Sequence, residues 1–89
     1  MKMAKTKTYD VYSDPGHAWL KVKIAELEKS GISDRITSCS YVRGDNAYLE
    51  EDHDANLFLS SIKERGIVPK LKFHDTNKRS KIRGYASFR

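Results

Sequence analysis

Long apolar runs and paired cysteines are both missing from this chain, and each absence excludes a class of protein. No apolar stretch approaches the ~20 residues that a membrane-spanning helix requires. No apolar segment follows the basic residues 1–7, so we expect neither a signal peptide nor an anchor, and a cytoplasmic protein. The single cysteine, Cys39, cannot form an intramolecular disulfide, and its strand-like surroundings predict a buried thiol.

Signatures of catalysis and metal binding are also lacking. The chain has no Cys-x-x-Cys pair, no glycine-rich phosphate loop and no nucleophile elbow. The acids around Asp52 lie at the start of an expected helix. Carboxylates there interact favourably with the exposed backbone N–H groups, which explains these acids without a catalytic role. Cys39, a histidine and an acid could form a nucleophilic triad, but nothing in the sequence selects one of the three histidines. We therefore predict a non-enzymatic protein with no catalytic residues, no metal site and no cofactor.

The composition is that of a small folded domain. Of the 89 residues, 38% are hydrophobic and 33% are charged, and the aromatic residues are spread along the whole length. This balance favours a soluble fold over disorder. A chain of this size can just form one hydrophobic core. We expect a single domain over residues 1–89, with residues 1–6 flexible.

Positive charge is concentrated near the C-terminus. The formal net charge is +5, and residues 70–89 alone carry +6, because seven cations there oppose a single acid. Cations interleaved with aromatic residues suit phosphate neutralisation combined with base stacking, and they equally suit a soluble, unpaired sheet edge. The candidate polyanion- or partner-binding residues are Lys70, Lys72, Lys78, Arg79, Lys81, Arg83 and Tyr85.

Alternating apolar and polar residues predict a hairpin in the first quarter of the chain. Its strands are expected over residues 8–12 and 17–22, joined by Asp14-Pro15-Gly16. Proline followed by glycine favours a type II turn at this place. A short helix over residues 23–29 follows, and Gly31 should end it.

A second strand pair and a longer helix are expected in the middle of the chain. The strands cover residues 36–43 and 47–51, with glycine and asparagine at the bend between them. The helix covers residues 52–65. Its apolar face consists of residues spaced i, i+3, i+4 and i+7, which are Ala55, Phe58, Leu59 and Ile62.

Two more strands complete the expected fold. The first begins at Pro69 and should point Leu71 and Phe73 inward. The second covers residues 82–88, with Ile82, Ala86 and Phe88 on one face. The sequence therefore predicts a small α+β domain, in which an antiparallel sheet carries two helices on one face, in the order β-β-α-β-β-α-β-β.

His17, Trp19 and Lys21 are the candidate partner-binding residues of the hairpin. Strand alternation places them on the face opposite Leu20 and Val22, which provide a core side. Trp19 either covers a second apolar layer or forms a partly exposed anchor. We predict the anchor, because Lys21 on the same face suggests contact with water.

Three segments, YSDPGHAWLKV, SYVRGDNAYLEEDHDA and TNKRSKIRGY, together resemble a group of small uncharacterised proteins encoded by phages, prophages and plasmids. Members of that group more often have glycine, proline and cysteine where this chain has Ala18, Lys23 and His53. The resemblance implies a mobile-element setting and no particular activity. Small non-enzymatic proteins in that setting often dock on host machinery, including defence nucleases.

Two functions are consistent with these patterns. The first is a non-enzymatic binding protein that docks on a host protein or protein–nucleic acid complex, as an inhibitor of a host defence system of the restriction or CRISPR type. The second is a small basic module that binds DNA or RNA. Both would use the exposed sheet face and the basic C-terminal residues, so they differ in the partner rather than in the surface.

Overall fold

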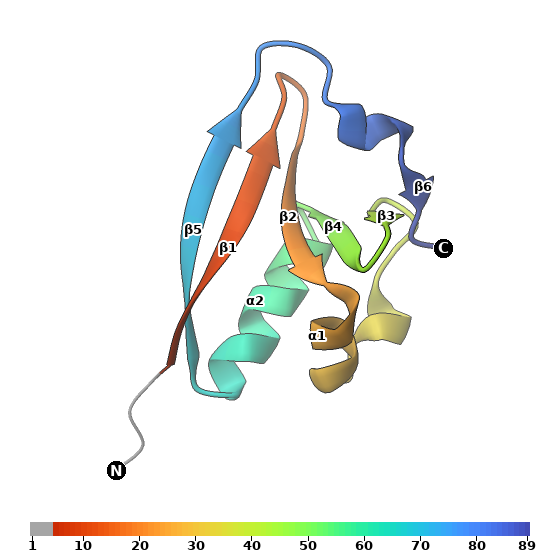
Figure 1. The fold of residues 1–89 in the computed structure, drawn as a ribbon. Coiled ribbons are helices and arrows are strands. Elements are labelled where there is room, and N and C mark those ends of the chain that lie inside the picture. Colours follow the sequence, from red (N-terminus) through yellow and green to blue (C-terminus); the bar gives the residue numbers. More distant parts are fainter. Residues whose placement is uncertain (1–4) are drawn as a thin grey trace.

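The computed structural model describes residues 5–89, which form a six-stranded sheet with two α-helices (Figure 1). In chain order the elements are β1 (Lys5–Ser13), β2 (Ala18–Lys23), α1 (Ile24–Lys29), the 3-10 helix η1 (Ser33–Arg35), β3 (Tyr41–Arg43), β4 (Asn46–Glu50), α2 (Asp54–Glu64), β5 (Ile67–Asp75), the 3-10 helix η2 (Lys81–Gly84) and β6 (Ala86–Ser87). The α+β class and the predicted order of strands and α-helices are confirmed.

Strand pairing is antiparallel except at one place. The spatial order is β5-β1-β2-β4-β3-β6, and β5 lies parallel to β1, with Lys5 opposite Ile67 and Ser13 opposite Asp75. The prediction of antiparallel pairing throughout is corrected here. Because β1, β2 and β4 alternate in direction, β4 runs parallel to β1, and α2 serves as the crossover that a parallel connection needs.

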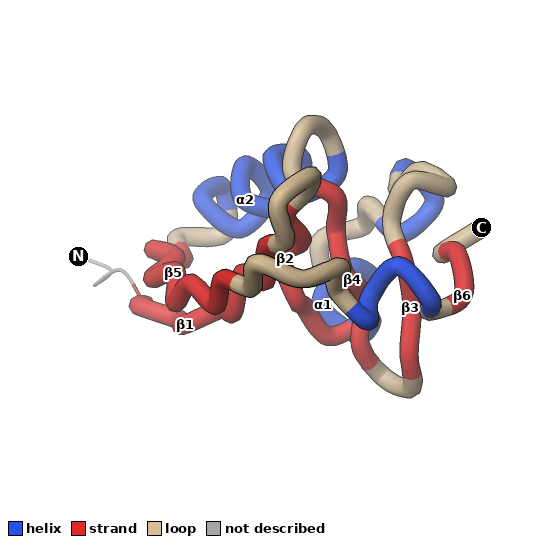
Figure 2. Tube along the Cα trace, turned by 90° about the horizontal axis from the view of Figure 1, so that it is seen from above, coloured by secondary structure: helices blue, strands red, loops and turns tan. Residues whose placement is uncertain are grey.

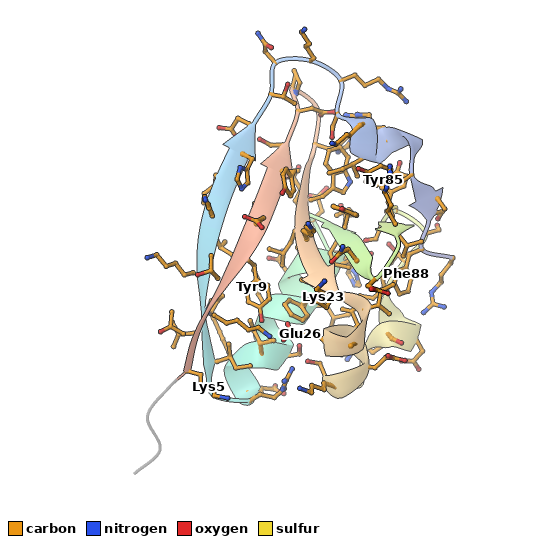
Figure 3. The ribbon with its side chains drawn as sticks, viewed as in Figure 1. Lys5, Tyr9, Lys23, Glu26, Tyr85 and Phe88 are labelled. Carbon is orange, nitrogen blue, oxygen red and sulfur yellow. The ribbon has the colours of Figure 1, made fainter. Side chains whose placement is uncertain are left out.

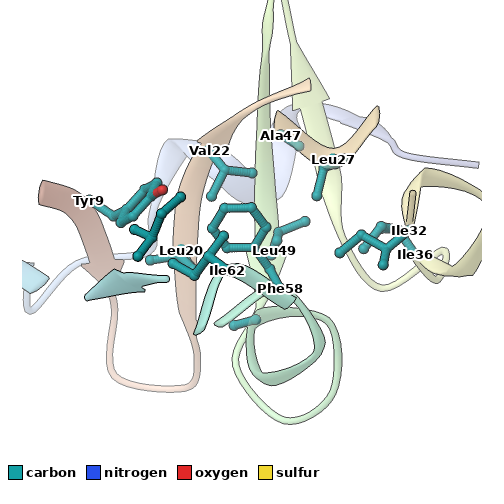
Figure 4. Close-up of a cluster of buried hydrophobic side chains, with 12 residues drawn as sticks. Tyr9, Leu20, Val22, Leu27, Ile32, Ile36, Ala47, Leu49, Phe58 and Ile62 are labelled. Carbon is teal, nitrogen blue, oxygen red and sulfur yellow. The ribbon is translucent and has the colours of Figure 1, made fainter. Parts of the chain in front are cut away.

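One face of the sheet carries the main hydrophobic core (Figure 4). Side chains of β2 and β4 meet Phe58 and Ile62 from α2 and Leu27 from α1, so both helices pack into the same cluster. The edge of the Tyr9 ring contacts Phe58, with the centroids 5.4 Å apart. Three of the four residues predicted for the apolar face of α2 are buried, and Leu59 is partly buried against them.

The helix ends follow the sequence signals. Gly31 has φ of +68°, and the N–H of Ile32 donates to the carbonyl of Leu27 over 3.1 Å, which closes α1 as predicted. Gly66 also has a positive φ, of +77°, just after α2, and its N–H donates to the carbonyl of Lys63 over 3.0 Å. Within residues 5–89, no helix has the length and apolar character to cross a membrane.

The opposite face of the sheet, called the open face below, is covered only at one side. There η2 lies across the strands, on the side away from α2 (Figure 2). A second hydrophobic cluster forms beneath it from Trp19, Tyr48 and Ile82. The prediction of one continuous strand over residues 82–88 is therefore wrong. Ser80 accepts a hydrogen bond from the Ile82 N–H and starts a 3-10 turn, which leaves only Ala86–Ser87 as a strand.

Two other predictions are corrected by local structure. Cys39 is exposed in a turn, because the Thr37 side chain accepts from its N–H and the strand begins only at Tyr41. Phe73 is 65% exposed, since α2 does not reach its end of β5. The flexibility of residues 1–6 stays a prediction: Lys5 and Thr6 belong to β1, and residues 1–4 lie outside the described part.

We expect two phenylalanine substitutions to separate core from surface. Phe58→Ala should destabilise the protein by about 3–5 kcal/mol, because it empties a fully buried site. Phe73→Ala should change the free energy of unfolding by less than about 0.5 kcal/mol. Urea unfolding of both variants measures the difference, and equal losses would contradict the assigned core.

Candidate functional site

A shallow cavity of about 170 Å³ lies on the open face, between the sheet and the C-terminal arm, which we define as residues 76–89. Its lining consists of Tyr12, Lys21, Tyr48, Ser80, Lys81, Ile82 and Tyr85. Three residues selected from the sequence, Lys21, Lys81 and Tyr85, thus come together from distant parts of the chain. Strand alternation brings Lys21 and Tyr12 to this face, and the arm supplies Lys81 and Tyr85.

Aromatic rings form a row across the open face. The Tyr12 ring stacks on His74 of β5 at 4.8 Å with an interplanar angle of 17°, and Tyr48 lies 5.1 Å from Tyr85. The Arg43 guanidinium lies over the Tyr85 ring at 5.1 Å. Burial raises the pKa of Tyr48, and the Tyr85 hydroxyl beside it adds to the shift. The row therefore combines tyrosine rings with the cationic Arg43 side chain beside them.

Asp14 holds the arm in place. Its carboxylate accepts two hydrogen bonds from the Arg83 guanidinium, at 2.6 and 2.9 Å, and one from the Ser80 N–H at 3.0 Å. It also accepts from the N–H groups of Gly16 and His17 in its own turn. These donors, above all Arg83, hold the pKa of Asp14 far below its usual range. The first turn and the arm are thereby joined by a charged, bidentate contact.

The turn itself differs from the predicted type II turn. In the described part of the chain, positive φ angles occur at Gly31, Gly44 and Gly66 and not at Gly16. Gly16 is instead suited to its place by size, since a Cβ atom there would lie 2.7 Å from the Arg83 Nη2 atom. Asp14 acts as an Asx turn residue and at the same time receives Arg83.

Trp19 is 3% exposed, so the prediction of a partly exposed anchor is wrong. The Arg83 guanidinium lies 5.5 Å from its ring, and Ile82 packs in the same cluster. Strand alternation placed Trp19 on the correct face, but the arm that covers it could not be seen in the pattern. His17 is exposed in the turn before β2 rather than in the strand, with its ring 6.1 Å from that of Trp19.

The predicted cations fall into three groups. Arg83 is paired with Asp14 and is not available to a polyanion in this arrangement. Lys78, Arg79 and Lys81 are exposed on the arm. Lys70 and Lys72 are exposed on β5, the edge strand at the opposite side of the sheet from β6.

The buried acids of the described residues are fully engaged in structural contacts. The Tyr9 hydroxyl donates to Glu26 over 2.8 Å, as their adjacent side chains in Figure 3 show, and Lys7 bonds the other carboxylate oxygen. Asp54 accepts from Thr37 and from Ser40, which ties the turn before β3 to α2. Burial raises the pKa of both acids, but their hydrogen bonds outweigh it and leave each pKa lowered.

A second cavity, of about 330 Å³, brings His17 and Cys39 to one surface beside Asp52. No hydrogen bond connects these three side chains in the described structure, and no group of three or more histidine, cysteine or acidic residues there is arranged to hold a metal ion. Every buried polar side-chain atom among the described residues has a hydrogen-bond partner. The described residues with shifted pKa values, such as Asp14 and Asp54, are therefore all engaged in hydrogen bonds, and none is an unsatisfied buried group.

Several residues of the site were missed from the sequence. Tyr12 and Tyr48 were placed in strands, but strand alternation alone does not distinguish an aromatic site from ordinary sheet packing. Asp14 was assigned only to a turn, because its partner Arg83 is 69 positions away. One signal could have identified Tyr12. It lies two residues after the charged Asp10, so both point to the same, polar face of the strand.

Asp14→Asn should release the arm and expose Trp19, because the amide cannot form the charged pair with Arg83. In the native protein the pKa of Asp14 is depressed, so its stabilising contribution is complete above the ordinary aspartate pKa of about 3.9 and is lost as the pH falls through the lower folded value. The only tryptophan reports this directly: its emission should shift to longer wavelength and become accessible to iodide in the variant at neutral pH.

Glu64→Gln is the control, since Glu64 is an exposed acid at the end of α2, on the face of the sheet away from η2. Unchanged quenching of Trp19 in Asp14→Asn would contradict the role of this ion pair.

Comparison with known proteins identifies neither a family nor a function for this chain. The chain matches no protein-family model, no curated protein and no solved structure. The resemblance to small proteins of phages, prophages and plasmids stays a prediction, and the functional argument depends on the geometry of the open face.

Proposed function

We propose that the protein is a non-enzymatic binding protein that binds single-stranded nucleic acid on the open face, along the groove between the sheet and the arm. One observation carries this proposal. Lys21 from β2 and Lys81 from the arm lie with Tyr12, Tyr48 and Tyr85 around a single shallow cavity.

This combination provides both interactions that a single strand offers. Lysine ammonium groups neutralise phosphates and release counterions, which gives affinity without sequence preference. Aromatic rings stack on bases, and each such contact contributes ~1–3 kcal/mol. Bases are available for stacking only when they are unpaired, so the arrangement favours a single strand over a duplex.

The surrounding charges support the same partner. Asp10, an acid beside the row of rings, accepts a hydrogen bond from the His74 ring at 2.9 Å, so its carboxylate is engaged. Lys78 and Arg79 continue the exposed positive charge from Lys81 along the arm. A phosphate backbone following the arm would meet these cations in succession.

The resemblance to mobile-element proteins suggests the biological setting in which this binding would act. In a phage or plasmid setting, the bound strand would belong to a host protein–nucleic acid complex, and occupying it would inhibit a defence nuclease. Binding to such a complex needs no chemistry from the protein, in agreement with a non-enzymatic role.

The salt dependence of binding to a fluorescein-labelled oligothymidine tests the proposal. Lys21→Gln and Lys81→Gln should each flatten the slope of log K against log salt by roughly one unit, as expected for one lost phosphate contact. Tyr12→Leu should instead weaken binding about tenfold with the slope unchanged, because it removes stacking and no charge.

Lys29→Gln, on the exposed end of α1, is the charge-matched control and should leave the slope as it is. Absence of oligothymidine binding at low salt, or equal slopes for Lys81→Gln and Lys29→Gln, would refute the site. A duplex bound more tightly than the single strand would refute the stacking contribution.

A further inference from the structure

β5 is an edge strand of nine residues, and no strand within residues 5–89 pairs with its outer side. Such an edge presents backbone N–H and C=O groups to any chain that can extend the sheet. Proteins commonly recognise extended peptides by adding them as a strand to an edge of this kind. The β5 edge is therefore a candidate interaction surface, at the opposite edge of the sheet from β6 (Figure 1).

The bonds at the two ends of β5 show which residues face outward. Gly66 accepts from the Lys5 N–H over 3.1 Å, and Thr76 donates to the carbonyl of Ser13 over 2.9 Å. Since peptide groups alternate along a strand, the even-numbered residues bond β1 and the odd-numbered residues face away. Leu71 and Phe73 thus present their N–H and C=O groups to the outside.

One outward-facing position of β5 is occupied by proline, which has no N–H to donate. Pro69 is odd-numbered, so the N–H that it lacks would have pointed away from β1, as expected for proline in an edge strand. An added strand would therefore be held through Leu71 and Phe73, which together offer four backbone hydrogen bonds.

Side chains of the same two residues lie beside an apolar groove. Phe73 is 65% exposed, and Leu71 is partly buried. A cavity of about 200 Å³ runs from them towards α2, lined mainly by Val11, Leu20, Ala55, Leu59, Leu71 and Phe73. Apolar side chains of an added strand would be buried in this groove.

The other side of the β5 edge is cationic. Lys70 and Lys72 alternate with Leu71 and Phe73 and are exposed on the open face. An added strand would therefore meet apolar groups on one face and two positive charges on the other. A partner with the complementary alternation has apolar residues at every second position and acidic residues between them.

We propose that the β5 edge binds an extended protein segment of alternating apolar and acidic residues as an additional antiparallel strand. Its apolar residues lie opposite Leu71 and Phe73, in the groove beside α2. Its acidic residues lie opposite Lys70 and Lys72.

Charge also argues against a second copy of this chain as the occupant. In an antiparallel β5–β5 pair centred on Leu71, Lys70 of each copy would face Lys72 of the other. Like charges directly opposite each other destabilise a strand pair. An acidic segment converts the same positions into two favourable pairs.

This inference goes beyond the proposed nucleic-acid site and does not depend on it. The nucleic-acid site uses Lys21, Lys81 and the tyrosines near the arm, whereas the strand site uses the outer edge of β5. The two sites can therefore be tested with different variants of one protein.

Amide hydrogen exchange with a synthetic peptide provides the test. The probe is a capped peptide of about six residues that alternates valine and glutamate, and the reference probe alternates valine and lysine. Saturation with the glutamate peptide should slow exchange of the Leu71 and Phe73 amides about tenfold or more. The amides of Lys70 and Lys72 already bond β1, so they provide an internal control that should not change. No added protection at Leu71 and Phe73 would overturn the proposal.

Two variants separate the apolar and ionic contributions. Phe73→Ser should weaken peptide binding about tenfold and leave oligothymidine binding unchanged. Lys72→Glu should reverse the preference, so that the lysine peptide binds better than the glutamate peptide. Lys63→Glu on α2 makes the same change of net charge at an exposed site and should preserve the native preference.

The remaining outcomes also decide the question. If Lys63→Glu reverses the preference as Lys72→Glu does, net charge rather than the β5 edge governs binding, and the proposal fails. Protection of Leu71 and Phe73 that rises with protein concentration, in the absence of peptide, would assign the edge to a second copy. Loss of peptide binding in Lys81→Gln would place the peptide on the nucleic-acid site instead.

Discussion

The contact between Asp14 and Arg83 is the constraint on which the second layer of this protein depends. It joins the first turn to the arm, and it brings Ile82 and the guanidinium itself over Trp19. Among the described residues, the one other arm group that bonds this carboxylate is the Ser80 N–H, so a single aspartate carries the charged contacts between the two segments. A buried carboxylate that lost this partner would retain its desolvation cost, so the contact fixes the position of the arm rather than merely adding stability.

The sheet separates two kinds of surface. Its helix-covered face buries the main core, and its open face divides between the cluster under the arm and the half-buried rings and lysines beside it. The β5 edge belongs to neither surface, because it lies where the cover of α2 ends. The two proposed sites, for a polyanion and for a protein segment, would therefore be separate, and neither requires a deep cleft that would weaken a limited core.

Periodic features were predictable from the sequence, and contacts between distant segments were not. The spacing of Ala55, Phe58 and Ile62 identified α2 and its buried face, and Gly31 marked the end of α1. Alternation gave the face of Trp19 but not the arm above it. Cys39 shows the same limit at short range, since its β-like neighbours formed a turn bonded to Asp54 instead of a strand.

The parallel pairing of β1 with β5 sets the order in which the chain can fold. The β1–β2 hairpin needs only a short loop, whereas β5 must close about sixty residues of chain before it gains its first contact with β1. The hairpin can therefore form early, but β5 and the arm join it late, because both depend on long-range closure. Folding speed should accordingly be governed by these two closures and resemble that of β-rich domains rather than helical ones.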